Sequence, residues 1–106
     1  MKMKRVAFKM KLKPGKEKEY KLRHDHIWPE LKEVLTQVGI KDYSIFWDKE
    51  TNTLFAVQKL EEENRVDELS QIEIMKKWWD YMKDLMDTNP DNSPLTYPLT
   101  EVFHMD

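Results

Sequence analysis

Tyr20 and His24 are the residues whose types and spacing most clearly suggest chemistry in this sequence. Residues four apart on a helix share a face, so the phenol and the imidazole would lie side by side. Both protonation states of histidine are available at neutral pH, and the pair therefore indicates general acid–base catalysis. The same face continues through Ile27, Leu31 and Leu35. Taken alone, this position favours a hydrogen-bonded core histidine over a catalytic one.

Trp78 and Trp79 are adjacent and could form the wall of a binding site. A flat apolar ring suits the C–H face of a sugar, while polar groups nearby bind the hydroxyls. Neighbouring helical residues are about 100° apart, so the two rings cannot point the same way. Core packing is the alternative for both tryptophans, and we expect one of them to serve only that purpose.

Several other kinds of site lack the residues that they need. The chain has no cysteine and only two glycines, which excludes disulfides, thiolate sites and glycine-rich phosphate loops. No serine lies in the G-x-S-x-G turn of hydrolases. The His24-Asp25-His26 segment suggests a metal site, but its histidines would face different directions and no further ligands follow. We therefore expect neither a metal nor a cofactor.

Length and charge limit the class of protein. The 106 residues suffice for one core, and the net charge of −2 argues against nucleic acid as a partner. The lysines between Lys2 and Lys21 alternate with apolar residues, which indicates a solvated surface instead of a phosphate-binding stripe. There is no apolar run of membrane-spanning length and no signal-peptide pattern. We expect a cytoplasmic protein without a membrane partner.

Apolar periodicity predicts the elements of the first half of the chain. Apolar and charged residues alternate over residues 5–13, which is typical of a half-buried strand ending at Pro14-Gly15. Residues 16–38 change to helical spacing. Pro29 should kink this helix or divide it in two, and Gly39 should end it.

The second half continues with strands at residues 43–47 and 54–60, joined as a hairpin. Residues 61–87 form a second helical region, in which Ser70-Glu73 fits a capping box. A loop rich in proline then leads to a last strand at residues 101–105.

The element order is strand, helix, strand, strand, helix, strand. Right-handed crossovers turn this order into an α+β fold of the ferredoxin-like βαββαβ type, a four-stranded antiparallel sheet with helices on one face, in a single domain over residues 1–106. Both hairpin strands are apolar on both faces, whereas one helical layer covers one face only. A second copy is the simplest cover for the other face, so we expect a homodimer with packed sheets.

Four segments together resemble the L-rhamnose mutarotase family: YKLRHDHIWPEL, KDYSIFWD, KKWWDYM, and NPDNSP followed by EVFHM. They occur in the same order and extend over essentially the whole chain. The resemblance implies a homodimeric α/β-barrel isomerase that interconverts the α and β anomers of L-rhamnose without cofactor or metal. It also implies that His24 is the catalytic proton donor and that Tyr20, Tyr43, Trp78 and Trp79 contact the sugar.

Interconversion of anomers requires two groups. A base removes the proton of the anomeric hydroxyl while an acid protonates the ring oxygen; the C1–O5 bond opens, the aldehyde rotates, and the ring closes on its other face. Asp91 and Asn92 are candidates for the second group, although turn formation explains them better. Two alternative functions stay open, a cofactor-independent monooxygenase of the dimeric α/β-barrel type and a non-catalytic sugar-binding module.

Overall fold

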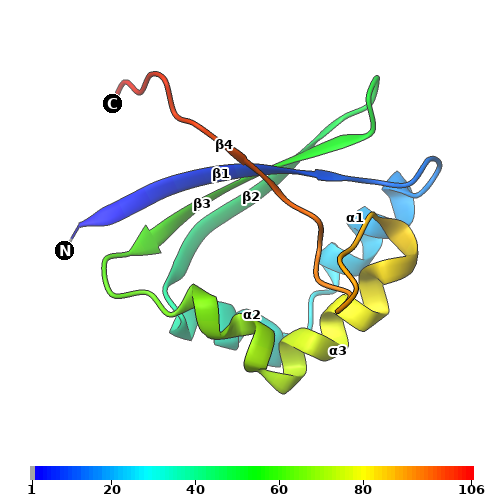
Figure 1. Ribbon diagram of the computed structural model, residues 1–106, viewed down its shortest axis with the longest axis horizontal. Helices are drawn as coiled ribbons and strands as arrows, with labels where there is room; N and C mark the ends of the chain where they lie inside the picture. The colour runs from blue at the N-terminus through cyan, green and yellow to red at the C-terminus, as the bar shows by residue number, and fades with distance from the viewer. Residues whose placement is uncertain (1) are drawn as a thin grey trace.

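A four-stranded antiparallel sheet with its helices on one face makes up the fold (Figure 1). The computed structural model describes residues 2–106. The elements in chain order are β1 (Met3–Lys11), α1 (Glu17–Asp25), α2 (Pro29–Gln37), β2 (Ile40–Asp48), β3 (Thr53–Glu61), the 3-10 helix η1 (Val66–Gln71), α3 (Glu73–Met82), the 3-10 helix η2 (Lys83–Leu85) and β4 (Tyr97–Leu99). The strand order β2-β3-β1-β4 confirms the predicted ferredoxin-like arrangement.

The core lies between the sheet and the helices. In β1 the inward positions of the alternating pattern, Met10 among them, pair in register with the inward positions of β3, as Met10 does with Leu54. In α3 the buried residues Met75, Trp78 and Met82 recur at helical spacing. The amphipathic patterns of strand and helix thus meet in one apolar layer.

Pro29 divides the first helical region in two, as the sequence predicted. α1 ends at Asp25, α2 begins at Pro29, and Trp28 between them is extended with φ −62° and ψ 127°. Proline is well suited to the first position of a helix, where no backbone N–H is needed, and it forces the preceding residue out of the helical region. His24 consequently lies in the last turn of α1.

Arg23 joins this last turn to the end of α3. Its guanidinium donates to the carbonyl oxygen of Tyr81 at 2.6 Å and to Asp84 Oδ1 at 2.9 Å, and it lies 4.5 Å from the centre of the Tyr81 ring. The side chain is only 13% exposed, and the guanidinium holds the pKa of Asp84 below its usual value. The arginine therefore fixes the helix that carries the adjacent His24 against α3.

The last strand lies earlier in the chain than we expected. β4 is Tyr97–Leu99, paired with Ala7–Lys9 of β1, and the predicted strand at 101–105 is an extended tail. Val102 and Phe103 in this tail are 92% and 77% exposed. Val102 and Phe103 have strand propensity, but a strand also needs a neighbour, and the register with β1 ends at Leu99.

The expected capping box does not form either. Ser70 belongs to η1, and the extended residue Ile72 precedes α3. Within residues 2–106 no side chain caps this helix. The chain changes direction between η1 and α3, which separates the two residues of the motif.

Gly39 ends α2 as predicted, with φ +101°, and a Cβ there would lie 2.9 Å from Asn64 Cβ and 3.1 Å from Asn64 Cα. We expect Gly39→Ala to lower the free energy of unfolding by more than about 2 kcal/mol, because the backbone strain adds to a clash. Gly15→Ala is the matched control: its φ is +78°, but no described atom lies within 4 Å of the new Cβ. It should cost about 1 kcal/mol. Equal losses in urea denaturation would contradict the steric argument.

Candidate active site

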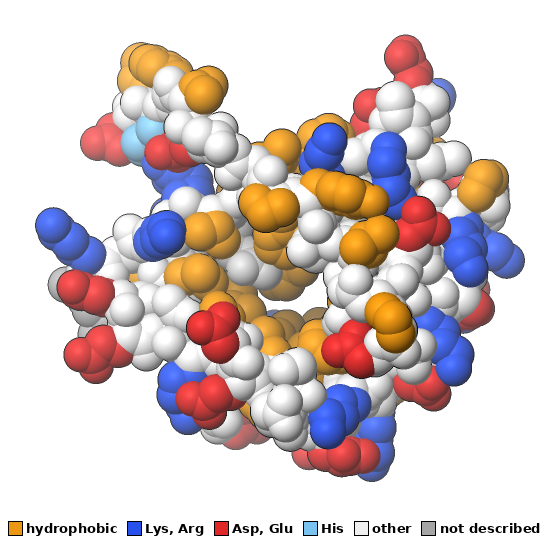
Figure 2. All heavy atoms as spheres, in the orientation of Figure 1, with side chains coloured by type: hydrophobic (Ala, Val, Ile, Leu, Met, Phe, Trp, Pro, Cys, Tyr) orange, Lys and Arg blue, Asp and Glu red, His pale blue; other side chains and the backbone are white. Residues whose placement is uncertain are grey.

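A cavity of about 1380 Å³ lies between the sheet and the helices. In Figure 2 it is a hollow bordered by hydrophobic side chains. Its lining includes the predicted catalytic histidine and the four predicted sugar contacts: Tyr20 and His24 from α1, Tyr43 from β2, and Trp78 and Trp79 from α3. Residues from three distant segments of the chain are thus brought to one site.

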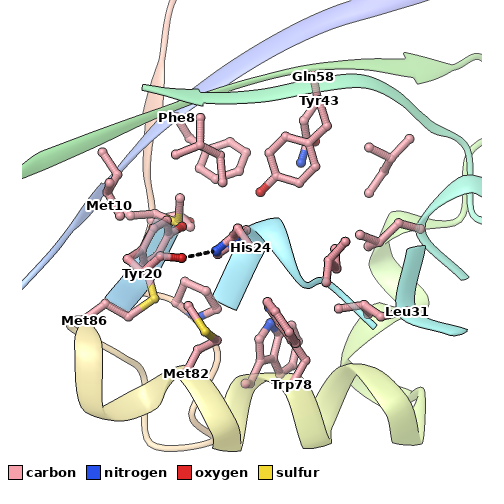
Figure 3. Close-up of a pocket in the computed structure, with 18 of the residues that line it drawn as sticks. Phe8, Met10, Tyr20, His24, Leu31, Tyr43, Gln58, Trp78, Met82 and Met86 are labelled. Carbon is pink, nitrogen blue, oxygen red and sulfur yellow. Dashed lines mark hydrogen bonds between the residues drawn. The ribbon is translucent and has the colours of Figure 1, made fainter. Parts of the chain in front are cut away.

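His24 is held between two aromatic rings at the end of α1. Its ring stacks on Tyr20 with 4.3 Å between centroids and meets Trp78 edge-on at 5.4 Å. Its Nδ1 lies 3.0 Å from the Tyr20 carbonyl oxygen (Figure 3). A carbonyl oxygen can only accept, so Nδ1 carries the proton and Nε2 is left for a ligand.

The surroundings of His24 favour its neutral form. Burial lowers the pKa of the imidazole; the hydrogen bond to the Tyr20 carbonyl and the charge of Asp25 oppose this shift but do not cancel it. At neutral pH the ring is therefore uncharged and Nε2 presents a lone pair. The resting histidine is a base, which becomes an acid once it has taken up a proton.

Both tyrosines of the cavity keep their protons at neutral pH. Burial raises the pKa of Tyr20, and the nearby Tyr43 raises it further. Burial also raises the pKa of Tyr43. Although 39% of Tyr43 is exposed, its ring is directed into the cavity (Figure 3), so the exposed surface faces the cavity. Each hydroxyl can donate a hydrogen bond to a ligand.

Trp78 and Trp79 both line the cavity, and both also pack in the hydrophobic core. Trp78 is nearly fully buried and contacts the edge of Trp28 at 5.0 Å between centroids. Trp28 in turn stacks on Tyr81, the residue that Arg23 covers. The aromatic wall beside His24 is therefore continuous with the contact that fixes α1 to α3.

The two polar loop candidates differ in position. Asp91 accepts hydrogen bonds from the backbone and the hydroxyl of Ser93, which lower its pKa and make it part of a turn. Asn92 lines the cavity, but its side chain donates to Asp80. Turn formation accounts for Asp91, as the sequence favoured.

Gln58 is a site residue that the sequence analysis missed. It is the one polar member of the inward row of β3, between Ala56 and Leu60, and it lines the cavity while only 8% exposed. Its side chain lies beside that of Tyr43 (Figure 3) and acts against the rise that burial causes in the pKa of the phenol. The sequence did contain a signal for this residue, because Gln58 is the single polar residue in the alternating apolar row of this strand.

The two histidines of α1 diverge. His26 donates through Nδ1 to the Leu22 carbonyl, as His24 does to Tyr20, but His26 is exposed outside the cavity. Among the described residues, no three His, Cys, Asp or Glu side chains are grouped closely enough to hold a metal ion. Nor is any helix in residues 2–106 long and apolar enough to cross a membrane.

Comparison with known proteins gives consistent matches. A family described as L-rhamnose mutarotase matches residues 5–105. The L-rhamnose mutarotase of Bacteroides thetaiotaomicron is 64% identical over 104 residues, which cover 98% of this chain and all of that one. The relative from Phocaeicola vulgatus with the same description is 62% identical over 104 residues.

Solved structures agree with these matches. The crystal structure of L-rhamnose mutarotase from Formosa agariphila superposes with a TM-score of 0.89 at 55% identity, covering 97% of this chain and 99% of that one. A conserved protein from Methanosarcina mazei superposes with a TM-score of 0.60 at 18% identity, which shows a shared fold alone.

We expect the pKa of His24 in the folded protein to lie below the ordinary value of about 6.5, with the proton of the neutral ring on Nδ1. Long-range ¹H–¹⁵N correlation spectra recorded from pH 8 to 5 measure both properties. Because the unfolded chain binds this proton more readily, the free energy of unfolding should fall as the pH drops below about 6.5. An Nε2–H tautomer, or a pKa above that of the urea-unfolded chain, would contradict this description.

Proposed function

The chain belongs to the L-rhamnose mutarotase family, and from this premise we propose that His24 transfers the proton in the reaction of that family. The protein is an isomerase that interconverts the α and β anomers of L-rhamnose. The observation that carries the role of His24 is its free Nε2 in the cavity, next to Tyr20 and Trp78.

The protonation state of His24 sets the direction of transfer. The neutral Nε2 accepts the proton of the anomeric hydroxyl while the C1–O5 bond opens and the ring oxygen gains a proton from a donor. The aldehyde then rotates about C1–C2. As the ring closes, the imidazolium returns its proton to the former carbonyl oxygen, so that His24 is the proton donor of the closing half-reaction.

The remaining site residues suit a 6-deoxy sugar. We propose that the rings of Trp78 and Trp79 face the C–H groups of the pyranose and that the hydroxyls of Tyr20 and Tyr43 bind its oxygens. The apolar lining of the cavity, which includes Leu31, would accommodate the methyl group on C5. The monooxygenase and binding-module alternatives rest on the fold alone, and no observation of the site favours either of them.

We also propose that a second copy covers the outer face of the sheet. Phe46 pairs with Phe55 and Ser44 with Val57 on this face, and Phe46 is 64% exposed. The apolar tail leaves the sheet without covering it (Figure 1). A homodimer would bury the exposed apolar side chains of the outer sheet face and those of the tail. The cytoplasmic location stays a prediction from the sequence.

Loss of the imidazole should abolish most of the catalysis. We expect His24→Ala to slow the exchange of L-rhamnose anomers by about 100-fold or more, since a general acid–base group is removed. Saturation-transfer NMR measures this rate directly. His26→Ala is the matched control, because it removes a helical histidine with the same carbonyl hydrogen bond but outside the cavity. If His24→Ala exchanged anomers as fast as the wild type, the assignment would be wrong.

Charge on the outer sheet face should separate the dimer. We expect Val57→Asp to shift the sedimentation of the protein from dimer to monomer, because each dimer would bury two uncompensated carboxylates. Gln71→Asp, on the helical layer, should leave the dimer intact. A wild-type protein that sediments as a monomer would disprove the interface.

A further inference from the structure

The pairing of β2 with β3 contains an irregularity next to the cavity. Ile40 pairs with Leu60 and Lys41 with Lys59, but the next pair is Ser44 with Val57. Asp42 and Tyr43 therefore oppose Gln58 alone, which is a β-bulge, and Asp42 takes a positive φ of 48°. Bulges of this kind change the direction of a side chain and are common beside active sites.

The bulge sets the direction in which the Tyr43 side chain points. If regular pairing continued from Lys41, Asp42 would share the inner face with Gln58 and Tyr43 would point outward. Instead Asp42 lies within 3.5 Å of Lys59 on the outer side. Tyr43 lies on the inner side beside Gln58 (Figure 3). The backbone thus places a phenol next to a buried amide.

Gln58 has an environment that needs an explanation. Its neighbours on the inner row, Ala56 and Leu60, are buried and apolar, and an amide in such a wall is destabilising unless it forms hydrogen bonds. The Tyr43 side chain lies beside the amide in the cavity (Figure 3), and the amide favours the ionised phenol against the opposing effect of burial. The Tyr43 hydroxyl points into the cavity (Figure 3), where its O–H can donate to a ligand.

We propose that Tyr43 is the second proton-transfer group of the anomer exchange and that Gln58 is the residue that positions it. The inference rests on the proposed role of His24 as the first group. In ring opening, His24 Nε2 takes the proton of O1 while the Tyr43 hydroxyl gives its proton to O5 and the C1–O5 bond breaks. The products are the aldehyde, an imidazolium and a phenolate.

Ring closure reverses both transfers. The phenolate takes back the proton of the O5 hydroxyl as O5 attacks C1, and the imidazolium protonates O1. As negative charge develops on the Tyr43 oxygen, the neighbouring Gln58 amide N–H donates a hydrogen bond to it in the proposed transition state. Gln58 therefore stabilises the transition state more than the bound sugar, and its removal should affect kcat more than KM.

Three variants test this proposal: Tyr43→Phe, Gln58→Met and their combination. Anomer exchange measured by saturation-transfer NMR over a series of L-rhamnose concentrations gives kcat and KM. We expect kcat to fall about 100-fold in Tyr43→Phe and about 10-fold in Gln58→Met, with KM changed less than about threefold. The double variant should be no slower than Tyr43→Phe, because Gln58 acts through the hydroxyl.

Other outcomes overturn the proposal. An unchanged kcat in Tyr43→Phe or Gln58→Met would do so, as would an effect on KM alone. A double variant slowed by the product of the two single effects would show that Gln58 acts independently. Gln71→Met is the surface control for the substitution itself. If Gln58→Met fails to fold, Gln58→Leu makes the same test.

The same variants distinguish the proposed roles of Tyr43 and Gln58 from the proposed role of His24. If His24→Ala abolishes exchange while Tyr43→Phe and Gln58→Met retain it, the roles of Tyr43 and Gln58 are wrong and that of His24 stands. If the wild-type protein does not accelerate anomer exchange, the proposed function itself fails.

Discussion

The hydrogen bond between His24 Nδ1 and the Tyr20 carbonyl is the contact on which the chemistry of the site depends. It is a local bond within one turn of α1, yet it fixes which nitrogen of the imidazole carries the proton and which one faces the ligand. Burial then keeps the ring uncharged. A charged or rotated imidazole would present a proton where the proposed proton transfer needs a lone pair.

That bond would not fix the position of His24 Nε2 in the cavity if α1 could move relative to the other lining elements. Pro29 ends the helical region just beyond His24, and Arg23 ties the same turn to the end of α3. Trp28, which precedes Pro29, packs against Trp78 and Tyr81 of α3. The precision of the site therefore comes from a short helix that is held at one end by an ion pair and by aromatic contacts.

Most of the fold could be predicted from the sequence, but only part of the site could. Helical spacing placed Tyr20 and His24 on one face, and Pro29 marked the break between helices, because both effects are local. The predicted position of β4 was wrong because side-chain types such as Val102 and Phe103 show strand propensity but not whether a neighbouring strand is present. Gln58 was missed because its importance arises from the β-bulge, and the positive φ of Asp42 depends on the pairing of two strands.

The volume of the cavity has a consequence for the reaction itself. A protein interior packed at ordinary density would hold a sugar ring in a single shape. Between opening and closing, however, the chain form of the sugar must turn its aldehyde over, and this turn requires rotational freedom. A space of about 1380 Å³ leaves room for that rotation. Looseness around the substrate is in this sense a requirement of an enzyme whose substrate and product differ only in the configuration at C1.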